Sequence, residues 1–230
     1  MRIAGIQKLS LLDYPGQLAC TIFTSGCNFA CPFCHNPSLV LPELFPPPIS
    51  VSEVLAFLED RRSVLDAVCI TGGEPLLQPD LAPFLQSVKN LGYLIKVDHN
   101  ASMPDRLAAL IEKGLVDYVA IDIKNEPNSY AETVGLESFD PAVILRCLDL
   151  LRETNTPFEC RTTVVKEFHD STKLHQLAAW IYPCERYFLQ KFSTNNDILS
   201  SKTLTAYSDE EMDKLLSVVS EILLFASKRG

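Results

Sequence analysis

Apolar residues follow two periodicities in this chain, and the two alternate about six times along it. Short runs rich in β-branched and aromatic residues predict strands, and between them apolar residues recur every three or four positions, as in amphipathic helices. Strand–helix units in a row predict an α/β fold with a parallel sheet and right-handed crossovers. The predicted strands are Leu18–Thr24, Ala67–Thr71, Tyr93–Asp98, Tyr118–Ile123, Phe158–Val165 and Arg186–Lys191.

The residues between these strands support the same assignment. Gly92 and Gly114 follow helical patterns, where glycine commonly ends a helix, and Ser208 with Glu211 has the spacing of a capping box. The helical patterns lie within residues 51–58, 81–88, 107–111, 144–151, 174–181 and 212–223.

Chain length decides between a complete and an incomplete barrel. A complete (β/α)8 barrel typically needs ~250 residues, and this chain has 230. We therefore expect an incomplete (β/α)6 TIM-like barrel with parallel strands, although an open doubly wound sheet has the same pattern. No interdomain linker interrupts the pattern, so residues 1–230 are expected to form a single domain.

Charge and composition limit the expected partners and cellular location of the protein. The chain has 20 Lys and Arg against 29 Asp and Glu, a net charge of −9, which disfavours a nucleic-acid partner. Charges interrupt each apolar stretch before the ~20 residues of a membrane span, so no membrane association is expected. The N-terminus lacks the order of a secretory signal, so we expect a cytoplasmic protein. Its 8 cysteines are then not a disulfide framework.

A cluster of cysteines follows the first predicted strand. Cys27, Cys31 and Cys34 form a C-x3-C-x2-C array, at the strand end where parallel α/β folds bind ligands. Three free thiols on a loop would be prone to oxidation. Zinc is one alternative, but its fourth ligand would be His35, directly beside Cys34. An iron–sulfur cluster is another, and three cysteines would leave one iron without a protein ligand.

With Phe33 before its last cysteine, this array resembles the signature of the radical S-adenosylmethionine (radical SAM) enzymes. The resemblance implies that Cys27, Cys31 and Cys34 hold a [4Fe–4S] cluster whose open iron chelates the amino and carboxylate groups of S-adenosylmethionine. It also implies that an electron from the cluster cleaves the sulfonium and gives a 5′-deoxyadenosyl radical. The other cysteines lack ligand spacing and are expected to be buried thiols, namely Cys20, Cys69, Cys147, Cys160 and Cys184.

A glycine pair follows the second predicted strand. Gly72, Gly73 and Glu74, followed by proline, resemble the family's GGEP motif, which receives the methionine amino group. Two glycines let the backbone approach a ligand closely, and a glutamate can accept from an ammonium. The alternative is an ordinary turn.

Charged residues end the later strands. Alternation along the fourth strand places Asp122 and Lys124 on one face, and they resemble the D-x-K motif that helps hold S-adenosylmethionine in activating enzymes of glycyl radical proteins. Arg161 resembles the family's arginine near the methionine carboxylate. For all of these residues the alternative is a structural salt bridge, which for Arg161 would involve Glu159 or Asp122.

The third strand ends in a departure from the family pattern. Asp98 matches an aspartate near a bound monovalent cation, but the family's Asp-Thr-Asn-Gly is here Asp98-His99-Asn100-Ala101. Alanine takes a positive φ less readily than glycine, so we expect a different turn or strain on Asn100. His99 is expected to be a solvent-exposed loop residue, with a proton donor as the alternative.

Across nearly the whole chain the sequence resembles activating proteins of anaerobic ribonucleotide reductases, a branch of the glycyl radical activating enzymes. Residues 11–16, 34–36 and 188–192 add to the likeness. It implies abstraction of a hydrogen from a glycine of a partner enzyme, with a flavodoxin or ferredoxin-type electron donor. The alternatives are a radical SAM enzyme for a small molecule, such as a queuosine-pathway-like synthase, and a non-catalytic metal-binding module.

Overall fold

A single eight-stranded sheet organises the chain in the computed structural model, which describes residues 1–194 and 197–229. The strands neighbour one another in sequence order, and each pair from β2 to β8 is parallel, whereas β1 is antiparallel to β2. The strands are β1 (Ile3–Ser10), β2 (Ala19–Thr24), β3 (Ala67–Gly72), β4 (Leu94–His99), β5 (Tyr118–Asp122), β6 (Phe158–Val164), β7 (Tyr187–Lys191) and β8 (Ala226–Arg229).

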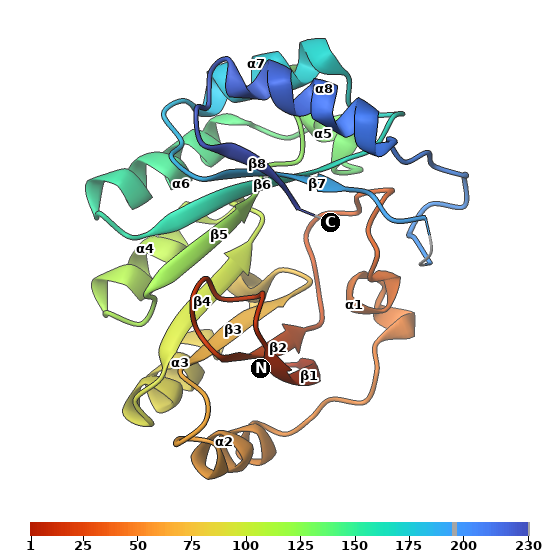
Figure 1. Ribbon diagram of the computed structural model, residues 1–230. Coiled ribbons are helices and arrows are strands. Elements are labelled where there is room, and N and C mark those ends of the chain that lie inside the picture. Colours follow the sequence, from red (N-terminus) through yellow and green to blue (C-terminus); the bar gives the residue numbers. More distant parts are fainter. Residues whose placement is uncertain (195–196, 230) are drawn as a thin grey trace.

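Helices follow the strands and cover the outer side of the curved sheet (Figure 1). Their apolar positions pack on outward-facing strand residues to form the main core, as expected for parallel strands covered by helices. The helices are α1 (Pro37–Val40), α2 (Val51–Asp60), α3 (Leu81–Asn90), α4 (Pro104–Glu112), α5 (Tyr130–Thr133), α6 (Ala142–Glu153), α7 (Ser171–Ile181) and α8 (Asp209–Ser220), with 3-10 turns at Pro42–Leu44, Pro75–Leu77 and Pro127–Ser129.

The expected incomplete barrel is confirmed, with two strands more than the sequence predicted. The six predicted strands correspond to β2–β7, and the capping box of Ser208 and Glu211 begins α8. The edge strands β1 and β8 were missed because neither has a buried alternating face. In the described part of the chain no pairing joins β1 to β8, so the sheet is not closed.

The barrel interior changes character from one end to the other. At the amino ends of the strands, Tyr14 packs on Tyr118 with ring centroids 5.6 Å apart, and Ala19 and Ala67 complete a small apolar cluster. Towards the carboxyl ends, the inward-facing residues of β4, β5 and β6 are charged. The apolar cluster fills the interior at the amino ends of the strands, and the charged end faces the loops that carry the predicted site.

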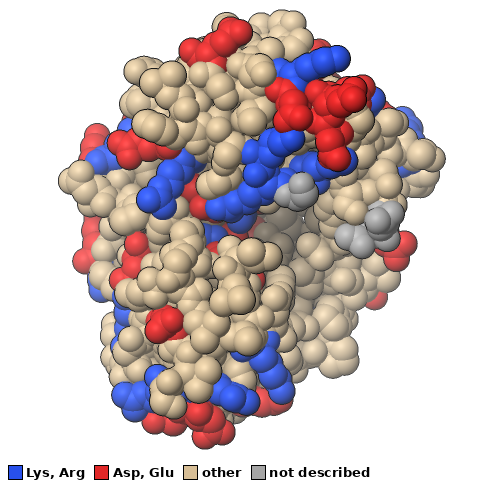
Figure 2. Space-filling model, viewed as in Figure 1, with Lys and Arg blue, Asp and Glu red and all other residues tan. Residues whose placement is uncertain are grey.

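The side of the molecule between the edge strands shows a row of basic side chains over β7 and β8 (Figure 2). Lys191 pairs with Asp209 of α8 at 2.6 Å, whereas Arg229 pairs with Glu159 of β6 at 2.7 Å. Below this row the surface is hollowed. Within residues 1–194 and 197–229, no helix is both long and apolar enough to cross a membrane.

Candidate active site

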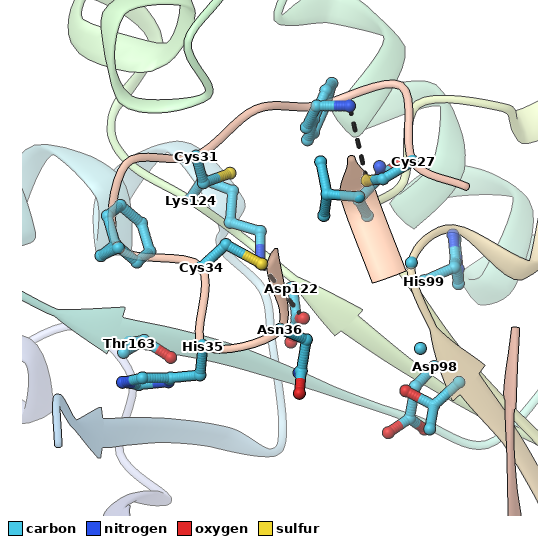
Figure 3. A pocket seen from close by; sticks show the side chains of 17 residues that line it. Cys27, Cys31, Cys34, His35, Asn36, Asp98, His99, Asp122, Lys124 and Thr163 are labelled. Carbon is cyan, nitrogen blue, oxygen red and sulfur yellow. Dashed lines mark hydrogen bonds and ion pairs between the residues drawn. The ribbon is translucent and has the colours of Figure 1, made fainter. Parts of the chain in front are cut away.

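The three cysteines of the C-x3-C-x2-C loop line one pocket at the carboxyl ends of the strands (Figure 3). Backbone hydrogen bonds fix this loop on several sides. The Gly26 amide donates to Leu39 O at 2.8 Å, and the Ala30 amide donates to Val134 O at 2.9 Å. Further along, the amides of Leu199 and Ser200 donate to the carbonyls of Cys34 and Pro32. The loop is therefore held in place by contacts to distant parts of the chain.

Burial and a neighbouring ammonium act in opposite directions on the thiols of Cys27 and Cys31. Burial raises the pKa of Cys27 to about 11 and that of Cys31 to about 12, and the nearby Lys124 ammonium acts in the opposite direction on both. Figure 3 shows the end of the Lys124 side chain directed at Cys34. Metal ligation requires thiolates and releases their protons, so an iron–sulfur cluster would convert these neutral thiols into ligands.

Two rings beside the cysteines anchor the loop. Phe33 is buried and packs on Phe168, with ring centroids 5.6 Å apart. The His35 ring stacks on Phe192 at 4.9 Å, and its Nε2 lies 2.9 Å from the carbonyl oxygen of Ser193. His35 thus links the cysteine loop to the segment after β7. Among the described residues, no three His, Cys, Asp or Glu side chains lie close enough to hold one metal ion.

The two glycines after β3 allow close backbone packing against the cysteine loop. A Cβ on Gly72 would lie 2.4 Å from Thr24 N, and one on Gly73 would lie 2.1 Å from Gly26 O. Gly72 also has a φ of 118°. Both glycines line the pocket, but the atoms that leave no room for a side chain belong to the end of β2 and to the residue before Cys27. The glycines therefore position the first cysteine.

Glu74 lies beneath this loop instead of facing into the pocket. The side chain is fully buried, and its Oε1 and Oε2 accept hydrogen bonds from the amides of Leu76 and Asn100 at 2.9 and 2.8 Å. Burial raises the pKa of Glu74 to about 7, although the two amide donors lower it. The expected acceptor for a ligand ammonium is thus already bound by backbone, and it joins the loops after β3 and β4.

The turn after Asp98 corrects two sequence-based expectations. Ala101 itself has a positive φ of 61°, and its amide donates to Nδ1 of His99 at 3.0 Å. His99 is 2% exposed, not solvent-exposed, because alternation along β4 turns it towards α6, where Cys147 Sγ lies 4.0 Å from its Nε2. Burial lowers the pKa of His99 to about 4. The buried, neutral His99 ring therefore supports the left-handed conformation of Ala101. The Asn100 amide donates to Glu74.

Charged side chains on three strands form a continuous chain of ion pairs inside the barrel. Lys96 Nζ lies 2.6 Å from Asp98 Oδ1, and Arg161 Nη1 lies 2.8 Å from Asp98 Oδ2. Arg161 Nε lies 2.9 Å from Asp122 Oδ1, and Lys124 Nζ lies 3.2 Å from Asp122 Oδ2. Burial alone would raise the pKa of Asp122, but the Arg161 and Lys124 charges outweigh it and hold that pKa well below its usual range.

The structure thus brings most of the expected site residues together. Arg161 pairs with Asp122, as the salt-bridge alternative predicted, but Glu159 pairs with Arg229 instead. Two residues that contact this site were not predicted from the sequence. Lys96 is a lysine in a strand without any motif, and Gly135 has a φ of 70° and a Cβ position 2.4 Å from Ala30 O in the cysteine loop.

These residues fit an iron–sulfur cluster with a small zwitterionic ligand. Three thiols share one pocket, and the Asp122 carboxylate and Lys124 ammonium line the same pocket. Soft thiolates suit iron–sulfur clusters, and charged groups suit the amino and carboxylate ends of an amino acid.

The family of the chain follows from its sequence. The family model described as the Radical SAM superfamily matches residues 21–175, a span that includes the three cysteines and the chain of ion pairs. The chain therefore belongs to the radical SAM superfamily. Membership implies an oxidoreductase that uses a [4Fe–4S] cluster and S-adenosylmethionine.

The names of individual relatives are more specific than that of the superfamily. A protein of Methanocaldococcus jannaschii, provisionally named a glycyl-radical enzyme activating enzyme, is 34% identical over 93% of this chain and 85% of its own length. The pyruvate formate-lyase-activating enzyme of Listeria monocytogenes is 25% identical over 92% of this chain and 86% of its own length. The 7-carboxy-7-deazaguanine synthase of Methanopyrus kandleri is 35% identical, but over 48% of this chain and 51% of the synthase.

Solved structures support the fold. A radical SAM methyltransferase from Sphaerobacter thermophilus superposes with a TM-score of 0.71 at 17% identity, covering 96% of this chain and 68% of the methyltransferase. At this level of identity, the likeness concerns the fold alone.

Proposed function

We propose that this protein activates a glycyl radical enzyme by abstracting a hydrogen atom from one glycine of that partner, and that the partner is an anaerobic ribonucleotide reductase. The observation that carries the proposal is the meeting of Cys27, Cys31 and Cys34 with Asp122 and Lys124 in one pocket at the carboxyl ends of the strands. The relatives that match most of the chain are named as activating enzymes, which supports a protein substrate.

The roles of the residues follow from their positions. Cys27, Cys31 and Cys34 would ligate the cluster, with Phe33 holding their loop against Phe168. When bound, the cluster supplies the electron that cleaves S-adenosylmethionine, and the cleavage provides the radical that takes the hydrogen. We propose a flavodoxin or ferredoxin-type protein of the cytoplasm as the source of that electron.

The side chains around the pocket would bind and orient S-adenosylmethionine. Gly72 and Gly73 present backbone to the pocket, and Lys124 places an ammonium there. Asp98, Asp122 and Arg161 support Lys124 from below through their ion pairs. The protein thus contributes ligands, orientation and electrostatics, whereas the cofactors supply the difficult bond cleavage.

A glycine substrate suits a narrow opening in a barrel that is not closed. Glycine has no side chain, so its backbone can enter where another residue would be excluded. A loop that leaves its own fold to react must be stabilised by contacts around the opening. We therefore expect a peptide from the partner's radical site to react less efficiently than the whole partner.

A pair of peptides tests the proposal. The reconstituted, reduced protein is incubated with S-adenosylmethionine and a short peptide from the radical site of the reductase, or with the same peptide carrying Gly→Val. We expect a glycyl radical signal in electron paramagnetic resonance spectra with the first peptide alone. Equal cleavage of S-adenosylmethionine with both peptides, without a backbone radical, would favour a small-molecule substrate like that of the deazaguanine synthase relative.

Replacing Lys124 by alanine should separate cofactor binding from cluster assembly. Lys124 follows the carboxyl end of β5, and its ammonium group does not ligate iron. The absorption spectrum of the iron–sulfur cluster should therefore persist in the variant. We expect S-adenosylmethionine to bind more weakly by the ~1.5–3 kcal/mol of a hydrogen bond to a charged group. Titration of the cluster-loaded variant measures this, with the exposed Lys113→Ala variant as control. An unchanged affinity would leave Lys124 as a structural ion-pair partner.

A further inference from the structure

Lys96 places an ammonium group inside the barrel, far from solvent. The residue is 1% exposed and is among the largest fully buried side chains. On β4 it lies in register with Cys69 of β3 and Tyr118 of β5, so neighbouring strands enclose it on both sides. A buried charge is costly unless it is paired. The partner is Asp98, whose Oδ1 accepts from Lys96 Nζ at 2.6 Å.

Both oxygens of the Asp98 carboxylate are already bound. Oδ1 accepts from Lys96 Nζ, with Cys69 Sγ at 3.6 Å, and Oδ2 accepts from Arg161 Nη1 at 2.8 Å. Burial alone would raise the pKa of Asp98, but the charges of Arg161 and Lys96 outweigh burial and lower it. Asp98 is therefore an ionised carboxylate flanked by two fixed cations.

This arrangement does not fit a monovalent metal ion, which the resemblance to activating enzymes implied near Asp98. Such an ion needs free carboxylate or carbonyl oxygens, and here the carboxylate oxygens already face nitrogen donors. A further positive charge would also be repelled by Lys96 and Arg161, which are both within 2.8 Å of Asp98. Repulsion between like charges is strong in a low-dielectric interior.

We propose that Lys96 is the built-in counter-cation of Asp98, so that this protein binds S-adenosylmethionine independently of monovalent metal ions. Lys96 acts as a positioning residue. It fixes Asp98, which orients Arg161, and Arg161 orients the Asp122 carboxylate that pairs with Lys124 at the pocket. The inference concerns the S-adenosylmethionine site of the proposed function and does not depend on which molecule gives up its hydrogen.

The cluster-loaded protein can be tested in potassium, sodium and choline chloride at equal ionic strength, about 0.1 M, so that general screening is the same. Affinity for S-adenosylmethionine and the midpoint of thermal unfolding are measured in each salt. For the unmodified protein we expect the same values in all three. A loss of affinity of about tenfold or more in choline would show that a metal ion is needed and would overturn the proposal.

Two variants at Lys96 distinguish a charge from a filled space. Lys96→Ala removes the ammonium and leaves room beside Asp98, so we expect weaker binding in choline by about tenfold or more, with recovery in potassium or sodium. Lys96→Met removes the charge but keeps most of the volume, so we expect the loss without recovery. If the Lys96→Ala variant and the unmodified protein bind S-adenosylmethionine with equal affinity in choline chloride, a role for Lys96 is contradicted.

These measurements stand apart from the test of the proposed function. No glycine peptide or partner is present, so a protein that acts on a small molecule would give the same salt dependence. If both variants fail to fold, the comparison of the unmodified protein in potassium and choline still decides the proposal.

Discussion

Replacing Cys31 by alanine is expected to abolish the brown iron–sulfur chromophore and all cleavage of S-adenosylmethionine. Cys31 is buried in the loop whose three thiols share one pocket, and each thiol would ligate a separate iron. Losing one of them leaves two irons of the cluster incompletely ligated, and among the described residues no other cysteine lines this pocket. Iron content, the visible spectrum and 5′-deoxyadenosine production measure the loss.

The matched control removes a different buried thiol. Cys160 lies on β6, is 0% exposed and does not line the cysteine pocket, so Cys160→Ala should cost stability but keep the chromophore. Deleting buried atoms in this way destabilises a core by lost packing. A colourless Cys160→Ala variant beside a fully coloured Cys31→Ala variant would show that the ligands have been assigned to the wrong residues.

Replacing Gly73 by alanine is expected to disrupt the same site without touching a ligand. The added Cβ would lie 2.1 Å from Gly26 O and 3.1 Å from Leu39 O. Both contacts are backbone atoms, which cannot turn aside as a side chain can, and Gly26 directly precedes Cys27. Overpacking of this kind typically costs ~1–3 kcal/mol or more. We expect cluster content and S-adenosylmethionine cleavage to fall by about tenfold or more, as ~1.4 kcal/mol corresponds to tenfold.

Gly5→Ala is the control for this substitution. Gly5 lies on β1 at a negative φ, and the nearest atom to its Cβ position is Phe23 Cδ2 at 3.9 Å, an ordinary contact. Iron content of this variant should equal that of the unmodified protein. Full iron loading in Gly73→Ala as well would mean that the cysteine loop tolerates displacement, and that the close packing after β3 does not position Cys27.

The sequence predicted the parts of this protein that repeat or that carry a recognisable spacing. Buried parallel strands such as Ala67–Gly72 are continuous apolar runs, and the helices between them have a clear apolar face, so six units could be found. The edge strand Ala226–Arg229 was missed because its residues are polar or small, and Arg229 pairs with Glu159 of β6, two strands away in the sheet.

Alternation predicted the shared face of Asp122 and Lys124, but the orientation of other side chains in the site could not be read from the sequence. Glu74 carries a motif, yet its carboxylate bonds to backbone beneath the loop. Lys96 belongs to no motif, and a lysine in a strand usually reaches solvent. Only the curvature of the sheet and the register of its strands bring Lys96 and Arg161 to the same carboxylate, that of Asp98. Ala101 holds a positive φ because the buried His99 accepts its amide hydrogen.

Transfer of deuterium tests the central claim most directly. The reduced, cluster-loaded protein is incubated with S-adenosylmethionine and a reductase radical-site peptide whose glycine carries deuterium at Cα, and the 5′-deoxyadenosine is analysed by mass spectrometry. The proposed function predicts that the product carries one deuterium, and that the same peptide without deuterium gives unlabelled product. Unlabelled 5′-deoxyadenosine formed at the same rate with and without the deuterated peptide would contradict abstraction from glycine.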